Sequence, residues 1–159
     1  MIKKLVAALT FIVILIAGAI GGQIGKGVGN SIFSPSKPSR QEIHAKLAEG
    51  FEVAAKKIND AGATMVDEET RLDKATVGPG ALLTYHYTFP NYSSSDIDFN
   101  LINTTVLQTV KKGVCASKEM KPSLQYGGKY AYSYTGNDGV HIGGFTIDRA
   151  DCGFDAKIP

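Results

Sequence analysis

The chain has 159 residues, and its formal net charge of +2 arises at the N-terminus. The first 29 residues hold three lysines (Lys3, Lys4 and Lys26) and no acidic residue, whereas the other 130 carry 14 basic and 15 acidic side chains. A near-neutral remainder without a basic patch excludes nucleic-acid binding, which needs clustered Lys and Arg side chains opposite phosphates. About 130 residues leave room for one small domain.

The N-terminal segment is apolar. Leu5–Ile24 contains no charged residue, and a helix over these 20 residues is about 30 Å long, the thickness of a hydrocarbon core. The two lysines before it predict that the N-terminus stays inside. Residues 1–29 are therefore expected to form a signal anchor, a single transmembrane helix in a bacterial inner membrane with the following domain in the periplasm.

A cleaved signal peptide is the alternative for the same residues. The apolar run is followed by Ala17-Gly18-Ala19, which matches a small-x-small cleavage site and would release a periplasmic protein cut near Ala19. Gly21, Gly25 and Gly29 recur every four residues, a spacing typical of transmembrane helices that pair closely. Both interpretations stay open at this stage. Residues 30–38, with two prolines among serines, are expected to be a linker.

The exported domain, residues 39–159, is predicted to begin with a helix. Ser39 and Glu42 form a capping box just after Pro38. Apolar residues then recur at helical spacing: Ile43, Leu47, Phe51, Ala54 and Ile58. Gly62 gives a stop signal, so the helix should span about 20 residues.

Strands and a second helix follow. We expect a short edge strand over 63–72, a turn over 73–80 and a strand over 81–89, where apolar and polar residues alternate. Ser94-Ser95-Asp96 can cap a helix that runs to residue 114, with a short helical turn over 117–124. Strands over 129–135 and 140–148 flank the hairpin signal Gly136-Asn137-Asp138-Gly139.

These elements predict an α+β fold. The order α-β-β-α-β-β, with antiparallel hairpins and long helices, is typical of a two-layer sandwich with one sheet. One N-terminal apolar helix precedes it.

The two cysteines are expected to form a disulfide. Cys115 and Cys152 both lie beyond the leader, in a compartment where thiols are oxidised. Their spacing matches no metal site, and no pair of histidines has ligand spacing either, so the sequence predicts neither a metal nor a cofactor.

Two groups of residues are candidate sites. The first is a set of five strand tyrosines at alternating positions: Tyr85, Tyr87, Tyr130, Tyr132 and Tyr134. If helices cover their face of the sheet they are core, and if the face is open they form a possible binding surface. The second is a carboxylate cluster near Arg71: Asp67, Glu69 and Asp73. Paired carboxylates serve hydrolases and divalent cations, but charges on an edge strand also discourage edge-to-edge pairing.

Several short motifs resemble those of a known family. They are Met65-Val66-Asp67, Thr70-Arg71-Leu72-Asp73, residues 83–88, Val114-Cys115, residues 130–134 with Asp138-Gly139, and residues 147–152. Their succession is similar to a family of small, uncharacterised bacterial proteins with an N-terminal membrane segment and an exported domain. The resemblance covers roughly residues 60–152. It implies an envelope location and supports pairing Cys115 with Cys152, without implying an activity.

Three functions remain as hypotheses. The first is a non-enzymatic, membrane-anchored periplasmic protein that binds another envelope protein. The second is a type IV pilin or pseudopilin-like subunit, although the apolar segment lacks the Glu of the prepilin motif. The third is a hydrolase that uses the carboxylates near Arg71.

Overall fold

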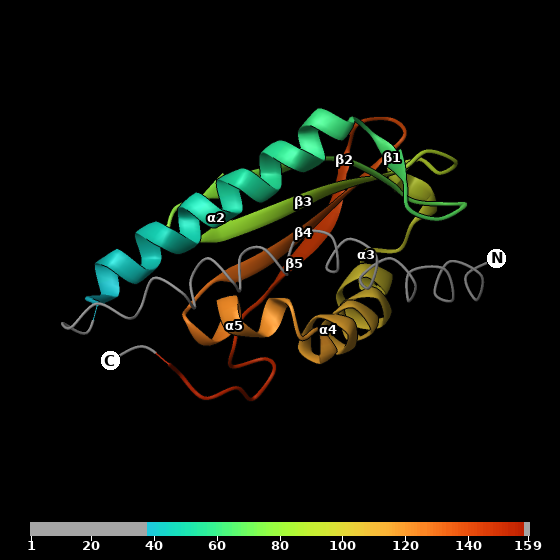
Figure 1. Ribbon diagram of the computed structural model, residues 1–159. Helices are drawn as coiled ribbons and strands as arrows, with labels where there is room; N and C mark the ends of the chain where they lie inside the picture. Colours follow the sequence, from blue (N-terminus) through green and yellow to red (C-terminus); the bar gives the residue numbers. More distant parts are fainter. Residues whose placement is uncertain (1–37, 158–159) are drawn as a thin grey trace.

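The computed structural model describes residues 38–157, and Figure 1 shows their arrangement. In chain order the elements are α2 (Arg40–Ala61), β1 (Thr64–Met65), β2 (Arg71–Gly78), β3 (Leu82–Phe89), η1 (Ser94–Asp96), α3 (Phe99–Leu101), η2 (Ile102–Val106), α4 (Leu107–Ala116), α5 (Met120–Gln125), β4 (Lys129–Gly136) and β5 (His141–Ile147). The expected apolar helix of residues 1–29 lies outside the described residues, as does nearly all of the linker. Within residues 38–157, no helix is long and apolar enough to cross a membrane.

The sheet is mixed, which corrects the expectation of antiparallel hairpins alone. The five strands lie in the order β1-β2-β3-β4-β5. The expected hairpins β2–β3 and β4–β5 are antiparallel, but the central pair β3–β4 is parallel over eight residues, from Leu82 opposite Lys129 to Phe89 opposite Gly136. A parallel pair needs a long crossover connection, and the helical segment from η1 to α5 supplies it.

Strand β2 lies later in the chain than predicted. Only Thr64 and Met65 form the short edge strand β1, and residues 73–78 of the expected turn belong to β2. The extent of β2 is set by its pairing with β3, in which Leu72 lies opposite Tyr87 and Ala75 opposite Tyr85. A bulge at Asp73 interrupts the alternation that would have signalled the strand.

Helix α2 agrees with its prediction. Both hydrogen bonds of the capping box are present: the Glu42 amide donates to Ser39 Oγ (3.2 Å), and the Ser39 amide donates to Glu42 Oε2 (2.6 Å). Near its C-terminal end, Asn59 donates to the Ala75 carbonyl (2.9 Å) and accepts from the Ala75 amide (2.8 Å). The Asn59 side chain thus pairs the backbone amide and carbonyl of Ala75 on the outer edge of β2, where β1 no longer supplies partners.

The second helix is less regular than predicted. Ser94-Ser95-Asp96 form a short 3₁₀ turn, and Asp98 caps α3 by accepting from the Asn100 amide (2.8 Å). The π-helical segment η2 then joins α3 to α4. Thr104 donates to the carbonyl four residues earlier (2.6 Å), a bond by which threonine bends helices. Helix α5 matches the predicted helical turn.

All the helices lie on one face of the sheet. Phe51 of α2 and Ser123 of α5 both contact Tyr130, while Phe99 and Ile102 approach Gly143 of β5. The fold class α+β and the two-layer arrangement are therefore as expected. The predicted order α-β-β-α-β-β is wrong, because three strands, β1, β2 and β3, lie between α2 and the helical crossover.

Candidate partner-binding end of the sheet

The five strand tyrosines lie beneath the surface on the face that carries the helices. The parallel register sets Tyr85 opposite Tyr132 and Tyr87 opposite Tyr134, with ring centroids 5.4 Å apart in both pairs. All five side chains are buried, with relative exposures of 1–6%. Burial raises the pKa of each of these phenols: Tyr85, Tyr87, Tyr130, Tyr132 and Tyr134. Of the two alternatives for these tyrosines, burial therefore agrees with a core role and contradicts an open binding surface.

We call these five stacked side chains the tyrosine ladder. Their hydroxyl groups differ in hydrogen bonding. Tyr130 shares a 2.6 Å hydrogen bond with Ser123, whose hydroxyl also donates to the Met120 carbonyl (2.7 Å). It is the one member whose hydroxyl is hydrogen-bonded to the part of the chain that the structure describes. The hydroxyls of the other four have no hydrogen bond within residues 38–157, although their rings are buried.

Three loops meet at one end of the sheet, where β3 and β4 both end. They are the β1–β2 loop, the β3–η1 loop and the β4–β5 hairpin, and we call this region the loop end (residues 65–70, 90–99 and 137–140). It lies on the right in Figure 1. Asn91 donates to the Glu68 carbonyl (3.3 Å) and to Glu69 Oε2 (3.2 Å), while the Ser94 amide and hydroxyl donate to Asp138 Oδ2 (3.0 and 2.7 Å). These bonds join the three loops into one surface.

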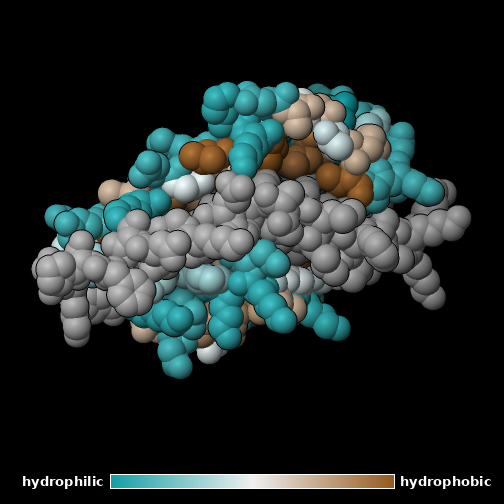
Figure 2. All heavy atoms as spheres, viewed as in Figure 1, coloured by the Kyte–Doolittle hydropathy of each residue, from teal (hydrophilic) through white to brown (hydrophobic). Residues whose placement is uncertain are grey.

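The loop end also carries apolar side chains in contact with solvent. Four large hydrophobic residues of the described part are exposed, and three of them lie here: Met65 (49%), Phe99 (57%) and Val140 (53%). The fourth is Val53 (51%) on α2. Figure 2 shows a mostly polar described surface, on which the visible apolar atoms gather in a band in the upper part of the view. Exposed apolar groups rimmed by polar ones are typical of protein-binding surfaces.

The charge of this region is negative. Seven carboxylates lie on the loop end or on the adjoining strand and helix ends: Asp67, Glu68, Glu69, Asp73, Asp96, Asp98 and Asp138. Arg71 and Lys74 are the two cations of the same segments. The loop end therefore favours a cationic partner.

The three carboxylates expected near Arg71 are hydrogen-bonded to different groups. Asp73 accepts from Arg71 Nε (2.5 Å) and from Thr88 Oγ1 (2.6 Å) on the face without helices. Glu69 Oε2 accepts from Asn91 (3.2 Å), whereas Asp67 Oδ1 accepts from the Glu69 amide (2.7 Å). Each of the three carboxylates therefore has its own hydrogen-bond partners. Among residues 38–157 there is also no group of three or more potential metal ligands.

Two polar atoms at the loop end are buried without a hydrogen bond. They are Asp67 Oδ2 and Thr70 Oγ1. Thr70 is 0% exposed, and Asp67 is half-buried in the β1–β2 loop. The sequence drew attention to Asp67 as part of a carboxylate cluster, but it contained no signal for Thr70, because burial of a threonine depends on tertiary packing.

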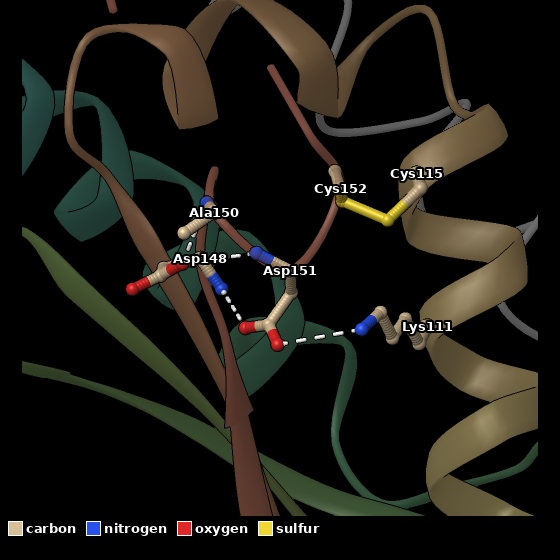
Figure 3. Close-up of a disulfide and its surroundings, with 6 residues drawn as sticks. All are labelled: Lys111, Cys115, Asp148, Ala150, Asp151 and Cys152. Atoms are coloured by element: carbon tan, nitrogen blue, oxygen red, sulfur yellow. Dashed lines mark hydrogen bonds and ion pairs between the residues drawn. A yellow bond between two sulfur atoms is a disulfide. The ribbon is translucent and has the colours of Figure 1, made fainter. Parts of the chain in front are cut away.

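A disulfide bond lies at the opposite end of the sheet. Cys115 at the end of α4 is bonded to Cys152 after β5, with Cα atoms 5.2 Å apart, as expected (Figure 3). Beside the disulfide, Lys111 Nζ contacts Asp151 Oδ1 at 3.5 Å, and Asp151 Oδ2 accepts from the Asp148 amide (3.0 Å). This end is structural, since the sulfur atoms are bonded to each other.

No protein family model and no curated protein sequence matches this chain. Solved structures with a similar fold include a Pseudomonas aeruginosa protein described as secreted, 18% identical, with a TM-score of 0.58 and coverage of 69% of this chain and 96% of that one. The type II secretion system pilotin AspS from Vibrio cholerae is 16% identical (TM-score 0.54; 70% and 97% covered). The pilotin EpsS from the Vibrio vulnificus type 2 secretion system is 11% identical (TM-score 0.51; 71% and 94% covered). At these identities the likeness establishes a shared fold.

Proposed function

We propose that this protein is a non-enzymatic envelope protein that binds another envelope protein through the loop end. The observation that carries the proposal is the position of Met65, Phe99 and Val140, three exposed apolar side chains at one end of the sheet. Side chains of this kind cost free energy in water and are stabilised when a partner covers them. The surrounding carboxylates would favour a partner of opposite charge and speed its association.

The shared fold supports the same role. Two of the similar structures are pilotins of type II secretion systems, and a role in assembling an envelope complex fits a small domain that exposes apolar side chains at one end. We extend that role to this chain as a pilotin-like function. A location in the bacterial envelope also fits the family resemblance of the sequence and the disulfide, which needs an oxidising compartment.

Site-specific photocrosslinking in intact cells tests the binding surface. A photoreactive amino acid would replace Phe99 or Val140 in the full chain, and Val53 would serve as a control because it is equally exposed but lies outside the loop end. We expect the same envelope protein to be crosslinked from both loop-end positions and not from Val53. Equal crosslinking from Val53, or none from Phe99 and Val140, would contradict the proposal.

We also propose that residues 1–29 hold the protein in the inner membrane, with the domain in the periplasm. The uncharged 20-residue run of Leu5–Ile24 supports this. Membrane fractionation followed by intact-mass measurement should find a membrane species that retains Met1. A soluble species that begins at Ile20 would show cleavage instead, and it would leave the binding proposal untouched.

A further inference from the structure

The two unpartnered polar atoms of the loop end need a physical explanation. Asp67 Oδ2 and Thr70 Oγ1 are buried and have no hydrogen-bond partner. Such atoms are rare in native structures, because a group that has lost its water must otherwise be paired. Two such acceptors in one loop at a surface can be paired by N–H groups that a partner supplies.

Their surroundings place them at the end of the tyrosine ladder. Thr70 precedes Leu72 by two residues and so faces the same side of the sheet, and Leu72 is paired with Tyr87, which is paired with Tyr134. After burial, the negative charge of Asp67 further raises the pKa of Tyr87, and it also contributes to the raised pKa of Tyr134. The register thus puts Tyr87 and Tyr134 in the part of the sheet that Thr70 adjoins, and their hydroxyls have no hydrogen-bond partner among the described residues.

Among residues 38–157, no ion pair involves the Asp67 carboxylate. Within the described residues, the one ion pair at this end joins Arg71 to Asp73, both of which face the side without helices. Lys74 is paired with His86 in the sheet register, also on that side. The oxygens available here are too few to hold Ca²⁺, which takes six to eight. A protonated nitrogen with several N–H donors suits this set of acceptors better.

We propose that Asp67, Thr70, Tyr87 and Tyr134 form a site for the cationic end of a Lys or Arg side chain that a partner protein presents beside apolar residues. The carboxylate and the hydroxyls accept its N–H groups. The neighbouring apolar residues of the partner pack on Met65, Phe99 and Val140. The inference rests on the proposed function and specifies the chemistry of its partner.

Titration with side-chain analogues tests the site directly. The isotope-labelled full chain in detergent micelles would be titrated with n-butylammonium and n-butylguanidinium, with n-butanol as the uncharged control, and followed by amide NMR. We expect the cations, and not the alcohol, to shift the amides of Asp67, Thr70, Tyr87 and Tyr134. Asp67→Asn, which keeps the acceptor for the Glu69 amide, should weaken cation binding about tenfold or more.

The matched control is Glu68→Gln, which removes the same charge from the adjacent, exposed position. It should change cation binding less than about twofold, because exposed charges are screened by solvent. Equal loss in both variants, or shifts spread over all acidic residues, would overturn the site and reveal a diffuse electrostatic effect.

Stability provides a second and independent measurement. Thr70→Val removes the unpartnered hydroxyl with almost no change of shape, so it should raise the thermal midpoint of the unliganded protein by about 2–6 °C. A lowered midpoint would show that the hydroxyl has a structural partner, which would also overturn the site.

The crosslinking experiment separates this inference from the proposed function. If Phe99 and Val140 still crosslink the partner when Asp67→Asn is present, and cation binding is absent, the partner surface stands and the cation site is wrong. If neither position crosslinks while the analogues still bind, the site stands and the proposed function is wrong.

Discussion

The two faces of the sheet are made by the same strands but differ in almost every property. One face carries the helices and buries the tyrosine ladder, while the other exposes short polar side chains from alternate positions: Thr76, Thr84, His86, Thr88, Ser133 and Thr135. In β3 the two sets alternate residue by residue, as the period of a strand requires. The difference teaches that coverage by helices, rather than strand composition, decides which side chains are buried.

The sharpest test of this difference is an alkaline titration. The pKa values of the five ladder tyrosines are raised above the ordinary value of 10.0, so the neutral phenols stabilise the fold fully below pH 10, and this stability is lost as the pH rises above it. Each phenol contributes about 1.4 kcal/mol per pH unit in that range. We expect phenolate absorbance and loss of circular dichroism to appear together in one steep transition.

Tyrosines that ionise near pH 10 while the circular dichroism stays native would contradict burial of the ladder. The two faces would then both be open, and the possible tyrosine binding surface would return.

Removal of a helix side chain that covers the ladder should have the next largest effect. Phe51→Ala empties a fully buried position that contacts Tyr130, with ring centroids 5.3 Å apart, and should lower the free energy of unfolding by about 3–5 kcal/mol. Val53→Ala, two residues along the same helix but exposed, should change it by less than about 0.5 kcal/mol. Urea unfolding of both variants measures the difference, and similar values for the two would show that α2 does not cover the sheet as described.

The disulfide links the helices to the sheet on the covered side. Replacing both Cys115 and Cys152 by Ser removes a crosslink between residues 37 apart and should cost about 4 kcal/mol. Urea unfolding of the oxidised protein, the reduced protein and the double variant should give one high and two low midpoints. If reduction leaves the midpoint unchanged, the packing of α4 on β5 is sufficient without the bond.

The smallest effect is expected on the face without helices. Thr84→Ala removes a half-buried side chain next to Tyr85 in sequence, and it should change the free energy of unfolding by less than about 1 kcal/mol. A cost comparable to that of Phe51→Ala, measured under the same conditions, would indicate that this face is also packed against something.

Local signals in the sequence were sufficient for much of the fold. The capping box and apolar spacing predicted α2, and alternation predicted β3 and both strands of the C-terminal hairpin. The pairing of Cys115 with Cys152 followed from the compartment. These features depend on residues close together in the chain or on general chemistry, so they can be recognised without the tertiary structure.

Other features depend on contacts between distant residues. The parallel pairing of β3 with β4 and the extent of β2 are set by where the helices pack, and a bulge at Asp73 hides the alternation of β2. The same holds for the candidate site. The sequence marked Asp67 for its charge, but Thr70, Phe99 and Val140 carry no local signal.

The sequence by itself determined the types of element, the disulfide and the two alternating sets of side chains in the sheet, because spacing along a chain is enough to produce them. Only the tertiary structure decided that the tyrosines are core, that the carboxylates near Arg71 have different hydrogen-bond partners, and that Asp67 Oδ2 and Thr70 Oγ1 are buried without a partner among the described residues. Burial and pairing are properties of the packed chain, since they depend on which distant elements exclude water from a given side chain.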